Sequence, residues 1–228
     1  MRCNELQTLS FHLNRLCGTI GGKLCERGKF DVRVVAGQAK GRVLKAVPGM
    51  NTRPTTDKVK EAIFSMIGPY FEGGAALDLF AGTGGLGIEA WSRGIQRIIL
   101  VDREKLSIDT IRHNLKTAGA EQSAEIYRND AERALKALDK RGLSFRLVFL
   151  DPPYRMTNMD EMMNGMAQAG MLEPDAFVVI EHDTAVVYPD EIAEFQCLKK
   201  AKYGDTSVTI YQYIGTDSKD RREADDNE

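Results

Sequence analysis

Two short segments of this chain carry the residue types best suited to chemistry. Residues 77–85, LDLFAGTGG, have the pattern of a buried strand that runs into a glycine-rich turn. Residues 150–154, LDPPY, have the pattern of another buried strand, which ends in an acid, two prolines and an aromatic. Glycines after a strand let a nucleotide-like cofactor approach the backbone closely. We expect both segments at the ends of neighbouring strands, where a cofactor and an acceptor would meet.

The glycine segment is compatible with two kinds of cofactor. Residues 82–87, GTGGLG, satisfy the GxGxxG pattern, and Asp102 follows Gly82 by 20 residues at the end of the next expected strand. Dinucleotide-binding enzymes have the same spacing, so a nicotinamide-dependent oxidoreductase is an alternative. Asp78 argues against a dinucleotide, because a carboxylate just before the loop would repel a pyrophosphate at the helix N-terminus. It suits S-adenosylmethionine, which has an ammonium, a sulfonium and no phosphate, and we favour that cofactor.

The expected cofactor site combines the glycine loop with the ends of three consecutive strands, since ligands of open α/β sheets bind at that edge. Asp102 would hold the ribose hydroxyls, and Asp130 would accept from the adenine amino group. Each acid also has a structural explanation, as a solvated strand end for Asp102 and as a helix cap for Asp130. The candidate cofactor-binding residues are Asp78, Phe80, Ala81, Gly82, Thr83, Gly84, Asp102, Asn129 and Asp130.

The second segment suits methyl transfer to a planar amino group. The lone pair of such a group is delocalised into its ring, so acceptors for its N–H bonds must aim it and balance its developing charge. Asp151 supplies a carboxylate, Pro152 lacks an amide donor and presents its carbonyl, and Tyr154 offers a face for stacking. These three are the candidate catalytic residues. The structural alternative is a strand that ends at the prolines with Tyr154 packed on the surface.

Alternating elements would position both segments. Strands are expected at residues 76–79, 98–101, 124–127, 147–150 and 177–180, and helices at 86–92, 105–118, 131–138 and 160–169. Short apolar strands that alternate with helices predict a parallel sheet covered on both faces. Residues 194–199 and 207–213 leave no room for a helix between them and predict an antiparallel hairpin at the sheet edge. The expected fold is α/β, with a Rossmann-like, mostly parallel, seven-stranded sheet.

A basic segment precedes this domain. Residues 33–35 and 42–46 predict a small hairpin, and the apolar spacing over residues 59–67 predicts a helix. Between Val32 and Lys60 the chain has seven lysines and arginines and one acid. This asymmetry favours a polyanionic partner, although a solvated basic face is the alternative.

Composition and patterning set the expected boundaries. Residues 1–31 are expected to be an extension outside the fold, with Val32 as the natural initiator, written Val because a GTG start codon was read internally. Residues 32–72 would form the basic hairpin and helix, 73–214 the main domain, and 215–228 a disordered acidic tail.

The four cysteines form no CxxC pair, so we expect no metal site, no disulfide framework and a reducing cytoplasm. No apolar run approaches the ~20 residues of a membrane span, and we expect a monomer.

The ordered motifs resemble the RsmD family, the bacterial 16S rRNA guanine-N2 methyltransferases of class I with a (D/N)PP(Y/F) signature. The resemblance covers residues 32–213 and rests on residues 33–37 (RVVAG), 41–42 (GR), 53–57 (RPTTD), 78–82 (DLFAG), 151–154 (DPPY) and 181–183 (EHD). It also agrees with Val32 as the initiator.

The resemblance implies methylation of the exocyclic N2 of one guanine in 16S rRNA, within the small ribosomal subunit or its assembly intermediate. Asp151 and Tyr154 would hold the base, which must be flipped out or already unpaired. Arg33, Lys40, Arg42 and Arg53 would contact phosphates, which makes binding salt-sensitive. Adenine-N6 of DNA and glutamine-N5 of protein are alternative acceptors, and a catalytically silent RNA-binding assembly factor is a third possibility. For His182 we favour a structural role over a role in the site.

Overall fold

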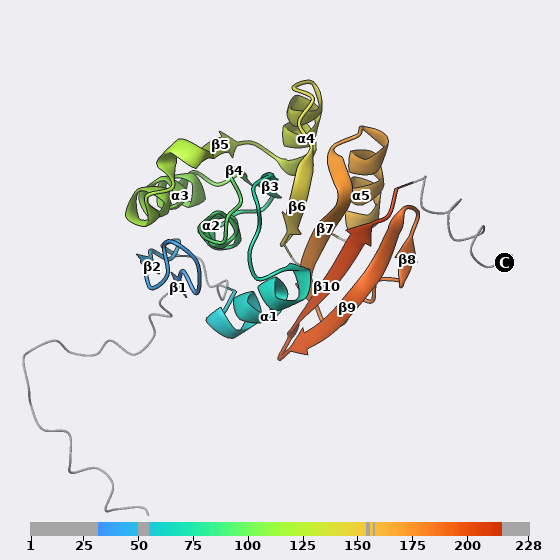
Figure 1. Ribbon diagram of the computed structural model, residues 1–228, viewed down its shortest axis with the longest axis horizontal. Helices are drawn as coiled ribbons and strands as arrows, with labels where there is room; N and C mark the ends of the chain where they lie inside the picture. The colour runs from blue at the N-terminus through green and yellow to red at the C-terminus, as the bar shows by residue number, and fades with distance from the viewer. Residues whose placement is uncertain (1–31, 50–54, 154–155, 157, 216–228) are drawn as a thin grey trace, which may run out of the picture.

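A computed structural model of the chain describes residues 32–49, 55–153, 156 and 158–215. The expected extension over residues 1–31, the tail beyond residue 215, Arg53 and Tyr154 lie outside the described residues. An α/β architecture is built on an eight-stranded mixed sheet, in the order β5-β4-β3-β6-β7-β10-β9-β8 (Figure 1). Its strands are β3 (Ala75–Asp78), β4 (Arg97–Asp102), β5 (Ala124–Arg128), β6 (Phe145–Leu150), β7 (Leu172–Asp183), β8 (Glu191–Ile192), β9 (Phe195–Tyr203) and β10 (Thr206–Tyr213).

Helices cover both faces of this sheet, as the apolar strands require. The helices are α1 (Asp57–Ile67), α2 (Gly85–Ser92), α3 (Lys105–Ala118), α4 (Ala131–Asp139) and α5 (Met159–Gln168), with a 3-10 turn η1 (Glu121–Ser123). Apolar residues of α1, α2 and α3 pack in one buried cluster, and those of α4 and α5 pack in another on the opposite face (Figure 1). None of the helices in the described ranges is long and apolar enough to cross a membrane.

The parallel part of the sheet reverses its order next to β3. The chain runs outward from β3 through β4 to β5, then returns to place β6 on the other side of β3. The loops that follow the carboxyl ends of β3 and β6 therefore run in opposite directions and open a crevice between them. Ligands of open α/β sheets bind in such a crevice. Asp78 ends β3, and Asp151 follows β6, so both predicted chemical segments reach this point.

The expected architecture is confirmed, with differences in detail at the C-terminal side. An eighth strand, β8, joins the seven that were expected, and its two residues are too few to produce a periodic signal in the sequence. The antiparallel hairpin of β9 and β10 is present, but β10 lies inside the sheet between β7 and β9. β7 is longer than the four residues expected, with Asp175 at φ 59° near its start.

The N-terminal hairpin is present as β1 (Val32–Arg33) and β2 (Val43–Leu44), each shorter than expected. Together with the turn between them it forms the arm, residues 32–47. The arm docks on α2 through Glu89, whose fully buried carboxylate accepts hydrogen bonds from the amides of Val35 (2.7 Å) and Ala36 (2.9 Å). Arg93 donates to the same carboxylate (2.8 Å), and buried Lys60 lies 3.6 Å from it. A carboxylate buried this deeply requires such partners, so the ion cluster holds the arm against the domain.

Candidate active site

A cavity of about 1190 Å³ lies at the carboxyl ends of the strands. Its walls come from the loops that follow β3, β4, β5, β6 and β7, from the turn between β9 and β10, and from the segment that leads into α1. Its location coincides with the reversal of strand order beside β3, where a ligand is expected. The cavity is therefore the candidate active site.

Seven of the predicted site residues line this cavity: Phe80, Gly82, Asp102, Asn129, Asp130, Asp151 and Pro152. Four other predicted residues do not line it: Asp78, which ends β3, and Ala81, Thr83 and Gly84 of the glycine loop that follows. The arm residues Arg33, Lys40 and Arg42 lie outside its walls. The fold thus brings the glycine loop after β3 and the Asp-Pro-Pro turn after β6 into one cavity.

The glycine loop turns sharply over a buried acid. Gly84 caps α2 in a left-handed conformation (φ 76°), which favours glycine. A Cβ at Gly87 would lie 2.5 Å from the Leu100 side chain, so any larger residue there would require Leu100 to shift or α2 to move away from β4. The carboxylate of Asp78 accepts a hydrogen bond from the Gly87 amide (3.1 Å) and so occupies a helix N-terminal donor that a phosphate would otherwise use.

Asp102 and Asp130 each have a local structural role within the cavity wall. Asp102 accepts from the amides of Gly82 (2.9 Å) and Glu104 (2.8 Å), one through each oxygen. Asp130 caps α4 by accepting from the Arg133 amide (2.9 Å). These bonds fix the orientation of both carboxylates and leave each with further acceptor capacity.

Asp151 has a neighbour that was not among the predicted site residues. Leu150 pairs with Ile180 in the parallel register of β6 and β7, so Asp151 and Glu181 follow side by side on the same face of the sheet. Both line the cavity, and the hydroxyl of Thr55 donates to Glu181 Oε2 (2.8 Å). Thr55 and Glu181 are therefore additions to the site. The motif at residues 181–183 could have indicated Glu181, because it follows a strand at the same edge.

Burial raises the pKa of three carboxylates in and beneath the cavity, Asp151, Glu181 and Asp78. Asp151 is open to the cavity, but the surrounding walls keep bulk water away and raise its pKa well above the ordinary value, and the nearby charges of Glu181 and Asp78 raise it further. Burial also raises the pKa of Glu181, against the Thr55 hydrogen bond. Burial raises the pKa of Asp78 to about 7, although its bond from Gly87 acts in the opposite direction.

His182 is engaged on both sides of its ring. Its Nδ1 lies 2.9 Å from the Asp183 carbonyl, which can only accept, so Nδ1 carries the proton. Its Nε2 then accepts from the Thr209 hydroxyl (2.8 Å). Burial lowers the pKa of the ring and favours this neutral form. These two hydrogen bonds order His182 at the end of β7, and the residue also lines the cavity.

The cavity wall is strongly acidic. Its lining includes eight carboxylate residues and two cationic ones, Lys58 and Arg103. This charge balance would repel a polyphosphate and attract a ligand that carries positive charge. Within the described part of the chain, no three histidine, cysteine or acidic side chains are arranged to hold a metal ion. The site can therefore hold a cationic ligand beside Asp151 and offer acceptors to an amino group.

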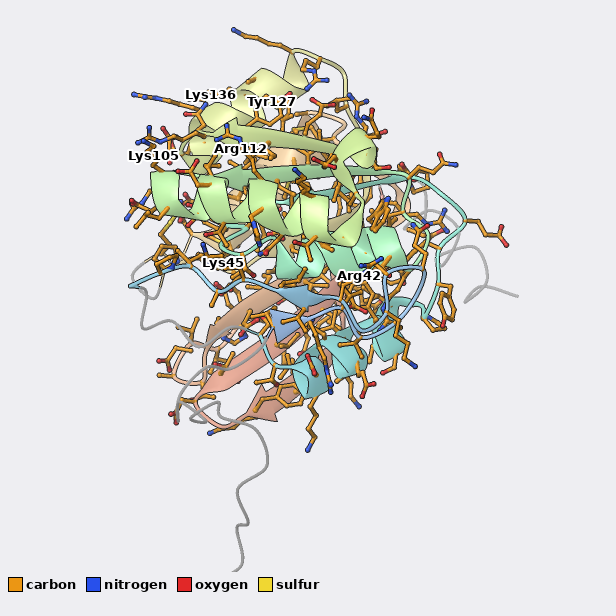
Figure 2. The ribbon with its side chains drawn as sticks, turned by 90° about the vertical axis from the view of Figure 1, so that its left-hand side faces the viewer. Arg42, Lys45, Lys105, Arg112, Tyr127 and Lys136 are labelled. Carbon is orange, nitrogen blue, oxygen red and sulfur yellow. The ribbon has the colours of Figure 1, made fainter. Side chains whose placement is uncertain are left out.

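Basic side chains gather on a different surface. Figure 2 shows Arg42 and Lys45 on the arm beside α3, with Lys105 and Arg112 on α3 and Lys136 on α4. Arg42 and Lys40 are exposed and form no ion pair with any described residue, whereas Arg33 pairs with Asp57. A polyanion would find exposed cations here and few in the cavity.

The comparisons with known proteins agree with this geometry. A family model described as conserved hypothetical protein 95 matches residues 32–212. The chain is 53% identical over 184 residues to "Putative rRNA methyltransferase YlbH" of Bacillus subtilis, covering 81% of this chain and 100% of the relative. It is 29% identical over 185 residues to "Ribosomal RNA small subunit methyltransferase D" of Escherichia coli, covering 81% and 91%. A solved structure named "Putative methyltransferase yhhF from Escherichia coli" aligns with a TM-score of 0.68 at 30% identity, covering 82% of this chain and 99% of that one.

Proposed function

Because this chain belongs to the RsmD/YlbH family of rRNA methyltransferases, we propose that it methylates the exocyclic N2 of a specific guanine in 16S rRNA. The methyl donor is S-adenosylmethionine, and the substrate is the small ribosomal subunit or its assembly intermediate in the cytoplasm. The observation that carries this proposal is the acidic cavity in which Asp151 and Pro152 lie one strand away from the glycine loop.

The cavity chemistry fits S-adenosylmethionine. Its sulfonium would supply an electrophilic methyl group, and its positive charges would be favoured by the acidic wall. Asp102 would accept from the ribose hydroxyls, and Asp130 with Asn129 would lie toward the adenine. Asp78 would act from beneath the loop, through its charge and its hold on Gly87.

Asp151 and Pro152 would prepare the acceptor. The carboxylate of Asp151 and the carbonyl of Pro152 can each accept one N–H bond of the guanine amino group, which directs its lone pair away from the turn. Aligning the amine with the methyl carbon is mainly a positioning effect. Since the alkylated nitrogen loses its proton readily, Asp151 can take that proton or pass it to water. Tyr154 would stack on the base.

The arm would hold the RNA. Lys40 and Arg42 are exposed on a rigidly docked hairpin, so they can contact phosphates without rearrangement. Arg33, restrained by Asp57, and Arg53 are further phosphate contacts in this proposal. The division between a basic arm and an acidic cavity lets the RNA backbone bind outside while a single base enters. We propose that the protein acts in this way as a monomer.

Two experiments separate this proposal from its competitors. A thermal-shift comparison should show that S-adenosylhomocysteine stabilises the protein and NADH does not; the reverse would support a nicotinamide-dependent oxidoreductase. Asp151→Ala should retain RNA binding while methyl transfer is lost. Unchanged rRNA methylation in cells that carry only Asp151→Ala would instead support a catalytically silent assembly factor.

A further inference from the structure

The reaction as proposed above does not use Glu181, although this side chain lines the cavity beside Asp151. Asp78 pairs with Phe149 in the sheet register, and Phe149, Val179 and Val208 pack in the cluster beneath α1 to α3. Strand alternation therefore places the side chains of Asp151 and Glu181 on that same face, one strand apart. Two acceptors thus lie next to each other where the target amine would be held.

Resting on the proposed function, we propose that Glu181 selects guanine by accepting a hydrogen bond from the base N1–H, while Asp151 and Pro152 hold N2. Guanine presents N1–H and the N2 amino group as adjacent donors on its Watson–Crick edge. Adenine presents an amino donor next to an N1 acceptor. An ionised carboxylate only accepts, so Glu181 matches guanine and would face the adenine N1 lone pair without a hydrogen bond.

Thr55 positions Glu181 for this role. Its hydroxyl donates to Oε2 (2.8 Å), which leaves Oε1 as the acceptor for an incoming base. Burial raises the pKa of Glu181, and the same bond opposes that rise by favouring the ionised carboxylate. Thr55 immediately precedes Thr56, whose side chain caps α1 by accepting from the Val59 amide, so the donor is held on an ordered helix start. Thr55 is accordingly a positioning residue, and Glu181 is the group that contacts the base.

The test replaces the N1–H donor of the base by an acceptor and the Glu181 carboxylate of the protein by an amide that can donate. The target guanine in reconstituted small subunits is replaced by 2-aminopurine, which keeps the 2-amino group but has an N1 acceptor and no O6. Wild-type protein and Glu181→Gln are compared by kcat/KM on both substrates. We expect Glu181→Gln to lose about 10–100-fold on guanine, consistent with one specific base contact. The amide of glutamine can donate to N1 of 2-aminopurine, so the preference for guanine should fall by at least about tenfold. The missing O6 affects both proteins equally and cancels in that ratio.

Two further variants complete the design. Glu191→Gln makes the same substitution on an exposed residue of β8 and should match the wild type on both substrates. Thr55→Val removes only the positioning hydroxyl and should lower kcat/KM on guanine by about three- to tenfold, with unchanged binding of S-adenosylhomocysteine. The inference is overturned if Glu181→Gln keeps the wild-type ratio between guanine and 2-aminopurine while the wild type methylates guanine. Failure of the wild type to methylate small subunits at all would instead refute the proposed function.

Discussion

The buried carboxylate of Asp78 accepts a hydrogen bond from the backbone amide of Gly87, 3.1 Å away, beneath the turn that faces the cofactor cavity. This contact ties the end of β3 to the first turn of α2. It compensates only part of the cost of burying the acid, since the pKa of Asp78 remains raised to about 7. Ionisation of Asp78 therefore destabilises the folded protein, and the free energy of unfolding should depend on pH.

Replacing Asp78 with asparagine should stabilise the protein at alkaline pH. Between the unfolded pKa near 3.8 and the folded value of about 7, the native state binds more protons than the unfolded state, so stability falls as pH rises through that window. Asparagine keeps an acceptor for Gly87 and cannot ionise. We expect Asp78→Asn to match the wild type near pH 4 and to gain up to about 4 kcal/mol above pH 7. Denaturant unfolding at several pH values measures this difference, and a pH-independent difference would contradict the account.

The pH dependence of methyl transfer should reflect the carboxylates of the cavity. The ionised carboxylates of Asp151 and Glu181 accept hydrogen bonds through both oxygens, whereas protonation turns one oxygen of each into a donor. Burial raises the pKa of each carboxyl, and the charge of Glu181 raises that of Asp151 further. Activity should therefore rise with pH along an acid limb that lies clearly above the usual carboxyl range. A single-turnover profile measures this limb. Asp151→Asn should keep some activity and shift the limb, whereas an unshifted limb would assign the titration to another group.

Asn114 should couple the arm to the glycine loop. Its fully buried amide accepts from the Lys45 amide (2.7 Å) and donates to the carbonyls of Lys45 (2.9 Å) and Thr83 (2.8 Å). Asn114→Ala leaves these groups without their partner and should cost about 1–3 kcal/mol of stability. It should also weaken binding of S-adenosylhomocysteine, because the carbonyl of Thr83 loses its anchor. Thr117→Ala removes an exposed hydroxyl from the same helix and serves as the control; equal effects of the two variants would exclude the coupling.

The exposed cations of the arm should determine how RNA binding responds to salt. Each phosphate contact adds close to one unit to the slope of log K against log salt, so Lys40→Ser with Arg42→Ser should reduce that slope by about 2. Affinity for S-adenosylhomocysteine should not change, because neither residue lines the cavity. Filter binding of small-subunit rRNA across a salt series measures the slope. Lys199→Ser, an exposed site on β9, is the control, and an equal loss there would show that general charge rather than the arm is responsible.

The sequence predicted the parts of this fold that depend on local pattern. Apolar runs and helical spacing located α3 at residues 105–118, and glycine spacing located the loop and the acid that binds Gly82. The pattern could not show that β10 would lie inside the sheet, because strand order depends on pairing between distant segments.

In the candidate site, too, local pattern was predictable from the sequence and contacts between distant segments were not. Residues at strand ends, such as Asp102 and Asp151, could be located because parallel strands end at one edge. The role of Thr55 could not be predicted in this way, because its contact with Glu181 joins positions that are 126 residues apart in the sequence. The sequence predicted that the charge of Asp78 disfavours a pyrophosphate, but it could not show that this side chain lies under the loop, bound to the amide of Gly87.

Methyl transfer to small subunits from a strain that lacks the gene is the most direct test of the central claim. The purified protein, with tritiated S-adenosylmethionine, should label 16S rRNA at one position, and nuclease mapping followed by nucleoside analysis should identify N2-methylguanosine. Asp151→Ala should leave these subunits unlabelled. Label on ribosomal protein, on DNA alone, or on adenine of the rRNA would contradict the account.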